Sequence, residues 1–202
     1  MGRFLEALRS ERRLIWLATL LLVGSAILGY AASESILSVM KNSPMWEQIQ
    51  ETVKAIKRQP DFFHAFQIIF LNNLRAAATM LGLGLFFGVF PMIALVSNGV
   101  LLGLVLAIAG QSGANPFFVL VTKILPHGIL ELPAILIAAA FGIRLGILAA
   151  RGLVSLFSPA LRVQNMQEWQ QLFQRIPVVV LGVSVMLIIA AVIESSLIVF
   201  LS

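Results

Sequence analysis

The sequence predicts an all-α, polytopic transmembrane helix bundle of five spans. Of its 202 residues, 59% are hydrophobic and 11% are charged, whereas soluble domains average about half apolar and a quarter charged residues. Its apolar runs are long enough to cross a bilayer as helices, which satisfy their own backbone hydrogen bonds. We therefore expect one integral membrane domain over residues 1–202, made of a basic N-terminus with the first span (1–32), an external amphipathic loop (33–65) and a helix bundle (66–202).

The composition also excludes several classes of site. The chain has no cysteine, which excludes disulfides, thiolate metal sites and cysteine nucleophiles. The formal net charge is +5, and basic residues beside membrane spans are typical of cytoplasmic ends rather than of nucleic-acid binding. Membrane lipid is thus an expected partner, and nucleic acid is not.

The first span covers residues 14–32 and follows Arg3, Arg9, Arg12 and Arg13. It is long for the apolar part of a signal peptide and lacks a clear cleavage site, so we interpret it as a retained span with a cytoplasmic N-terminus. The polar stretch 33–64 comes next and is placed outside. Within it, Ser43-Pro44 opens an amphipathic helix.

The second span is predicted at residues 66–90, with Pro91 turning the chain into the third span at 93–109. A fourth apolar segment runs from 117 to 141 and contains Pro126 and Pro133. Because proline removes a backbone donor, we expect this segment to be kinked, broken or re-entrant. Division at residues 126–128 gives six spans or a re-entrant hairpin, and we favour five.

The last part of the chain contains a basic stretch and the fifth span. Ser158-Pro159 opens a second amphipathic helix, which we expect along the cytoplasmic surface, and the fifth span covers 178–200. Residues 144–175 are placed in the cytoplasm because of four arginines, namely Arg144, Arg151, Arg162 and Arg175. The resulting location is the cell membrane, as a multi-pass protein.

Glycines recur at short spacing in the second and third spans. Small residues about four apart allow helix backbones to approach closely in lipid. We expect helix packing at Gly82, Gly84, Gly88, Gly99 and Gly103. The second span then packs on another helix, either of the same chain or of its own copy in a homodimer.

Polar side chains also interrupt the apolar spans. A charge near the bilayer centre costs from about 2.5 to more than 10 kcal/mol, so such residues are candidates for function. His127 and Glu131 are four residues apart and share one helical face. We expect them to converge with Glu194 in one buried polar site, joined by other intramembrane polar residues: Asn72, Asn73, Arg75 and Asn98.

Two forms of this site remain open. In the first, it is an ion-pair and hydrogen-bond network that fixes helix register, with Arg75 as counter-ion. In the second, His127, Glu131 and Glu194 bind a divalent metal such as zinc, because imidazole and carboxylate are suitable zinc ligands. Binding of a substrate or a partner by the same residues is a further alternative.

The order of several motifs resembles the stage II sporulation protein M family. The resemblance covers residues 66–200 and rests on five elements: Asn72-Asn73; Gly82, Gly84 and Gly88; Asn98-Gly99 with Gly103; the run from His127-Gly128 to Glu131 and Pro133-Ala134; and Ile193-Glu194 in the last span. The first 65 residues match in layout alone.

This resemblance implies a role in endospore formation. Members act during engulfment with the peptidoglycan-degrading sporulation proteins D and P, which work on the wall outside the membrane. The resemblance therefore implies a non-enzymatic scaffold at the septal membrane, with the external loop 33–64 as the contact for these partners. Two other functions stay open, a transporter or channel for a small solute or ion and an intramembrane metal-dependent hydrolase using His127, Glu131 and Glu194.

Overall fold

The computed structural model describes residues 2–40, 47, 51 and 61–200, apart from the side chains of 40, 123, 127 and 200. Over these residues the regular elements are helices, and five of them are long and apolar enough to cross a membrane. The prediction of an all-α five-span bundle is therefore confirmed. The amphipathic helix predicted from Ser43 lies outside the described residues.

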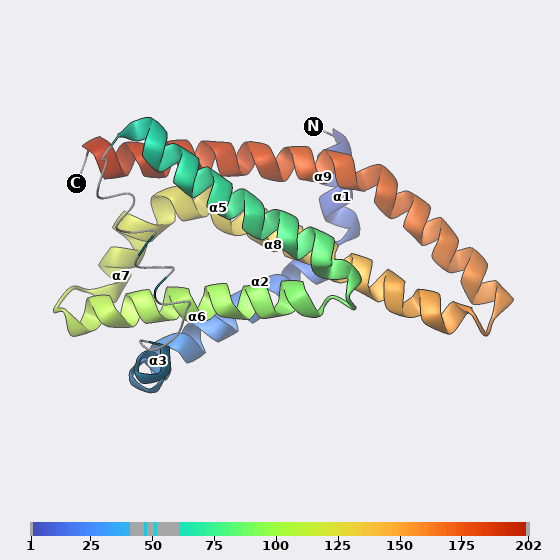
Figure 1. The fold of residues 1–202 in the computed structure, drawn as a ribbon, viewed down its shortest axis with the longest axis horizontal. Coiled ribbons are helices and arrows are strands. Elements are labelled where there is room, and N and C mark those ends of the chain that lie inside the picture. Colours follow the sequence, from blue (N-terminus) through green and yellow to red (C-terminus); the bar gives the residue numbers. More distant parts are fainter. Residues whose placement is uncertain (1, 41–46, 48–50, 52–60, 201–202) are drawn as a thin grey trace.

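The elements follow one another in an up-and-down order (Figure 1). They are α1 (Gly2–Ser10), α2 (Arg12–Ala31), α3 (Ser33–Met40), α5 (Phe62–Gly82), the 3₁₀ turn η1 (Leu83–Leu85), α6 (Val89–Gln111), α7 (Pro116–Val119), the π-helical turn η2 (Leu120–Ile124), α8 (Leu125–Ser155) and α9 (Pro159–Phe200). The connection between α8 and α9 projects from one end of the bundle, and α3 and α7 lie toward the other end. We call these the hairpin end and the opposite end.

Helix α8 is the central helix of the bundle. In its most apolar stretch 67% of the residues are buried, against 22–28% in the other four spans. Its buried side chains include Ala134, Ala138, Phe141 and Leu148, which pack on α1, α5 and α9. A helix that is apolar on all sides is typical of the core of a bundle.

Glycines bring the helix backbones into contact at two places. In the first, Gly99 and Gly103 of α6 lie against Leu22, Ser25 and Ala26 of α2, so closely that an added Cβ would clash. In the second, Gly84 lies against Gly142 of α8, and a Cβ at either residue would meet main-chain atoms. Close approach of small residues replaces the hydrophobic effect between helices in lipid.

The turn between the second and third spans comes earlier than predicted. Phe87 and Gly88 have φ of 56° and 73°, and α6 starts at Val89. Positive φ ends the preceding helical segment, whereas Pro91 sits in the first turn of α6, where no backbone donor is needed. The reversal is therefore made by Gly88 and not by Pro91.

The fourth segment, expected to be kinked, broken or re-entrant, contains a π-helical turn, and it ends later than predicted. The turn η2 ends two residues before Pro126, and Pro133 lies inside the uninterrupted α8. Helix α8 then continues past residue 141 to Ser155, because the Gly142 and Gly146 backbones pack on the α5–α6 connection. Arg144 is thus part of the same helix as the fourth span.

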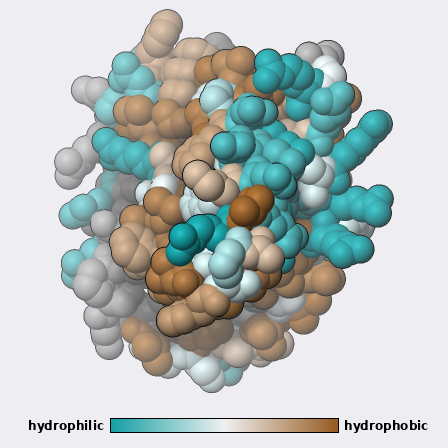
Figure 2. Space-filling model, turned by 90° about the vertical axis from the view of Figure 1, so that its right-hand side faces the viewer, coloured by the Kyte–Doolittle hydropathy of each residue, from teal (hydrophilic) through white to brown (hydrophobic). Residues whose placement is uncertain are grey.

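The second amphipathic segment is continuous with the last span. Helix α9 runs for 42 residues with Pro177 inside it, and it bends between its projecting part and its bundle part (Figure 1). Proline inside a helix removes one hydrogen bond and typically bends the axis without ending it. The expected separate surface helix is instead the second arm of a hairpin with α8, and hydrophilic side chains cover much of this end (Figure 2).

Candidate functional site

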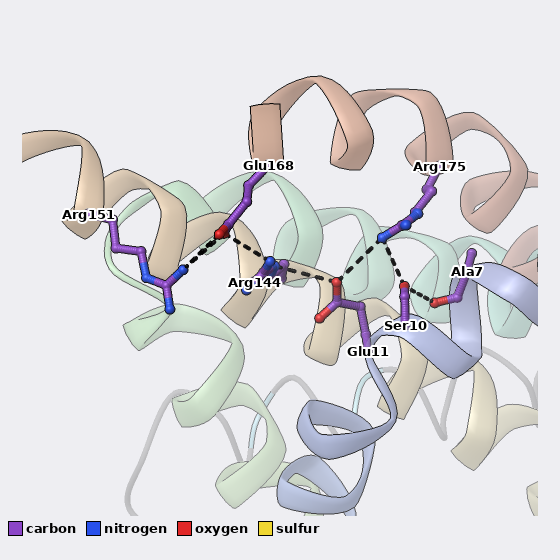
Figure 3. A network of polar contacts seen from close by, with 7 residues as sticks. All are labelled: Ala7, Ser10, Glu11, Arg144, Arg151, Glu168 and Arg175. Atoms are coloured by element: carbon purple, nitrogen blue, oxygen red, sulfur yellow. Dashed lines mark hydrogen bonds and ion pairs between the residues drawn. The ribbon is translucent and has the colours of Figure 1, made fainter. Parts of the chain in front are cut away.

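A cluster of ion pairs joins three segments of the chain at the hairpin end (Figure 3). Glu11 lies between α1 and α2, directly before the first span. Its carboxylate is 3.4 Å from Nε of Arg144 on α8 and 4.0 Å from Nη1 of Arg175 on α9. One carboxylate therefore contacts two arginines that lie 133 and 164 positions later in the sequence.

Burial is the largest influence on the pKa of Glu11. Its side chain is 7% exposed, and this desolvation raises the pKa of the carboxyl above its ordinary value. Arg144 and Arg175 lower the pKa in turn, and the carboxylate of Glu168 raises it again. The two guanidinium groups thus stabilise a carboxylate whose burial is only partly offset.

Glu168 of α9 extends the cluster along the hairpin. It accepts from Nη2 of Arg144 at 3.1 Å and from Nη1 of Arg151 at 2.9 Å. Nε2 of Gln164, one turn away on α9, also donates to it at 3.3 Å. Arg144 therefore lies between two carboxylates, and both arms of the hairpin are fixed to the start of the first span.

The N-terminal helix α1 is held at the same place. Arg175 donates to Oγ of Ser10 at 3.0 Å, and that hydroxyl donates to the carbonyl of Ala7 at 2.7 Å. Ala7 is buried, and the Phe4 ring lies against Gly182 of α9. Sequence reasoning used these arginines only for topology and missed Glu11 and Glu168. The available signal was that both carboxylates were predicted on the same membrane side as the arginines.

Two of the predicted intramembrane polar residues come together in a cavity. Asn98 of α6 and Glu131 of α8 line a space of about 150 Å³ with Gly128 and apolar side chains. The cavity also borders Ile124, the last residue of the π-helical turn. The cavity is lined mainly by apolar side chains, and Asn98 and Glu131 are its polar groups. Many transporters bind ions beside such helix irregularities.

The other predicted residues are distributed over the bundle. Asn73 is buried on the inner face of α5 with Ile69 and Ala77, whereas Asn72 is exposed. Glu194 lies on α9, half-buried, three residues after Ala191, which packs on α5. Glu194 does not line the cavity of Asn98 and Glu131.

A metal site on His127, Glu131 and Glu194 stays a prediction. The described side chains contain no group of three metal-ligating residues, but the side chain of His127 is not among them. The donor types, one imidazole and two carboxylates, fit zinc. Such a site would bring together α8, which carries His127 and Glu131, and α9, which carries Glu194. These two helices pack against each other in the core.

Arg75 is placed on the surface of the bundle. Its side chain is exposed on α5, within a span of residues 62–85. Over the described residues, no ion pair joins it to Glu131 or to Glu194. An arginine near the bilayer centre costs from about 2.5 to more than 10 kcal/mol unless it is paired or reaches water.

The comparison with protein families matches nearly the whole chain to a family model. The model for "Stage II sporulation protein M" matches residues 17–197, from the first span to the last, which includes the cavity, the Arg75 helix and most of the ion-pair cluster. No curated protein matches the chain, and no solved structure does. The family resemblance of the motifs is therefore confirmed, and this multi-pass membrane protein belongs to the stage II sporulation protein M family.

Proposed function

We propose that this protein is a membrane scaffold of the engulfment machinery, which anchors peptidoglycan-degrading partners at the septal membrane. By the family resemblance, these partners are the sporulation proteins D and P. The hairpin end faces the cytoplasm in this proposal, because Arg9, Arg12, Arg144 and Arg151 lie there and basic residues favour that side. The stretch of residues 33–65 then faces the wall.

The observation that carries the proposal is how the five spans are tied into one body. Backbone contacts at Gly84 and Gly99 join neighbouring helices. The Glu11 cluster fixes the start of the first span to both arms of the hairpin. Parts far apart in the sequence therefore keep fixed positions, as a scaffold requires if it is to present a binding segment at a constant place.

The test is co-purification of D and P with the chain from membranes. One variant replaces residues 43–60 by a glycine–serine linker of equal length. We expect it to insert in the membrane in normal amount but to lose both partners. The control Phe157→Ser changes a side chain that is 90% exposed at the tip of the hairpin, and it should retain them. Retention by the linker variant, or failure of the wild type to bind either protein, would refute the proposal.

A second candidate, ion transport, is favoured by the cavity of Asn98 and Glu131. A half-buried carboxylate beside a π-helical turn suits binding of a proton or a small cation. Flux measured in vesicles containing the purified chain tests it. Transport that is present in the wild type and absent in Glu131→Gln would favour this function over the scaffold.

A further inference from the structure

We propose that the exposed face of α5 around Arg75 binds a membrane-spanning helix of another protein, and that this helix carries an Asp or Glu near the middle of its span. This goes beyond the proposed function, because the contact lies inside the membrane and not at the external segment. Its failure would leave the binding of D and P at residues 33–65 untouched.

The depth of Arg75 follows from residues that mark the hairpin end. Gly84 and Gly88 pack on α8 at Gly142, Ile143 and Gly146, next to Arg144, which pairs with Glu11 just outside the first span. Arg75 precedes Gly84 by nine residues, or about 14 Å at 1.5 Å per residue. The hydrocarbon core is about 30 Å thick, so the Cα of Arg75 lies near its centre.

Arg75 belongs to a continuous exposed stripe on α5. Its members recur at helical spacing and all are exposed: Gln67, Leu71, Arg75, Ala78 and Gly82. Asn72 and Thr79, on the flank of the stripe, are exposed as well. Intramembrane charges normally face the interior of a bundle and pair there. A stripe with a charge and several polar groups that faces away from its own bundle indicates contact with another protein.

A groove runs beside the stripe. It has a volume of about 340 Å³ and lies between α5, α8 and α9, with Ala78, Gly82, Val180 and Ser184 among its lining residues. Ala78 and Gly82 follow Arg75 by about one and two turns. Small side chains let a second helix approach its neighbour closely, so a helix seated in this groove would pass directly beside the guanidinium.

The charge of Arg75 selects the occupant. A guanidinium pairs most strongly with a carboxylate, which can accept two parallel hydrogen bonds. A second copy of this chain is a poor match in depth. Glu194 follows Ala191, which packs on Ala65 near the opposite end, so it is displaced from Arg75 by about 20 Å along the helix axis. Glu131, the other carboxylate predicted inside the membrane, lines the cavity between α2, α6 and α8. The carboxylate that meets Arg75 is therefore assigned to a different spanning helix.

The experiment uses the full chain in phosphatidylcholine vesicles at pH 8, labelled at one cysteine introduced by Glu34→Cys. The probes are synthetic leucine–alanine spanning peptides with Asp, Asn or Leu at the centre, and energy transfer measures their binding. We expect the Asp peptide to bind at least tenfold more tightly than the Leu peptide. Arg75→Leu should remove this difference. Arg75→Glu should lose the Asp peptide and instead bind a peptide with a central Lys.

A pair of glycine variants tests the groove separately from the charge. A Cβ at Gly82 or at Gly24 meets no atom within 4 Å, so a side chain can start at either position without a clash at its Cβ. Gly82→Leu places a side chain in the groove and should weaken binding of the Asp peptide at least tenfold. Gly24→Leu, on α2, should leave binding unchanged. Detergent melting curves identical to the wild type would show that both variants, and Arg75→Leu, are folded.

Two results would overturn the proposal. The first is equal binding of the Asp and Leu peptides by the wild type. The second is self-association of the wild-type chain that Arg75→Leu and Gly82→Leu both abolish, without preferential binding of the Asp peptide, which would assign the face to a second copy. If binding of the Asp peptide depends on both Arg75 and Gly82, the intramembrane docking site is established.

Discussion

The carboxylate of Glu11 lies 3.4 Å from Nε of Arg144, and Arg144 also reaches Glu168 at 3.1 Å. Replacing Arg144 by Gln leaves the 7%-exposed Glu11 with Arg175 alone. We expect a loss of roughly 1–3 kcal/mol in unfolding free energy, between the value of a surface pair and that of a fully buried one. Denaturation in mixed detergent micelles measures it. Arg162→Gln, at an exposed position of α9, is the matched control and should cost under about 0.5 kcal/mol; equal losses in the two variants would contradict the cluster's role.

The pH dependence of Glu11 has a definite sign. Burial raises the pKa of this carboxyl in the folded chain above its ordinary value of 4.5. The folded state then binds a proton more readily than the unfolded state, so the contribution of Glu11 to stability is greatest below pH 4.5 and declines as pH rises through the raised pKa. Glu11→Gln lacks this titration. The stability of the wild type relative to Glu11→Gln should therefore fall between pH 4.5 and neutral pH, and a rise over that interval would reverse the assignment.

Gly84 and Gly82 differ in what surrounds them, although only one residue separates them. A Cβ at Gly84 would collide with the main chain of Gly142, whereas one at Gly82 would enter open space. Gly84→Leu should thus destabilise the bundle by at least the 1–3 kcal/mol typical of overpacking, because backbone cannot move aside cheaply. Gly82→Leu should not. Thermal unfolding in detergent separates the two variants, and equal melting temperatures would refute the close packing of the second span on α8.

Membrane sidedness can be measured because the chain has no cysteine. Glu34 of α3 and Gln164 of α9 are both exposed and lie toward opposite ends of the bundle. A cysteine introduced at Glu34 should react with an impermeant maleimide added to intact cells. A cysteine at Gln164 should react only after the membrane is opened, and the reverse order would invert the proposed topology.

Local patterns in the sequence were sufficient to predict the spans. The apolar runs, the basic N-terminus and the prolines at 126 and 133 predicted five helices with an irregular fourth, because length, hydropathy and backbone donors are local properties. The end of α8 was predicted too early. Residues 142–155 are held in a helix by packing at Gly142 and Gly146, which depends on a segment more than 50 residues earlier. The continuation of α9 through Pro177 likewise reflects packing that overrides a local helix-breaking signal.

The polar sites were harder to predict than the helices. Asn98 and Glu131 do line one cavity, since both occur at comparable depth on neighbouring spans. Depth alone does not fix the rotation of a helix about its axis, however, and Arg75 therefore faces outward where an inward position was expected. The pairing of Glu11 with Arg144 joins residues 133 positions apart, and no spacing rule connects such positions without the fold.

The central claim, that the chain holds wall-degrading proteins at the membrane, is tested most directly by flotation. Vesicles containing the purified chain, and empty vesicles of the same lipid, are mixed with purified D or P and centrifuged through a density gradient, and peptidoglycan cleavage is assayed in each fraction. We expect D or P, with its cleavage activity, to float with the chain-containing vesicles well above the amount that floats with empty ones, while vesicles with the chain alone cleave nothing. Equal flotation with empty vesicles, or cleavage by the chain alone, would contradict the scaffold.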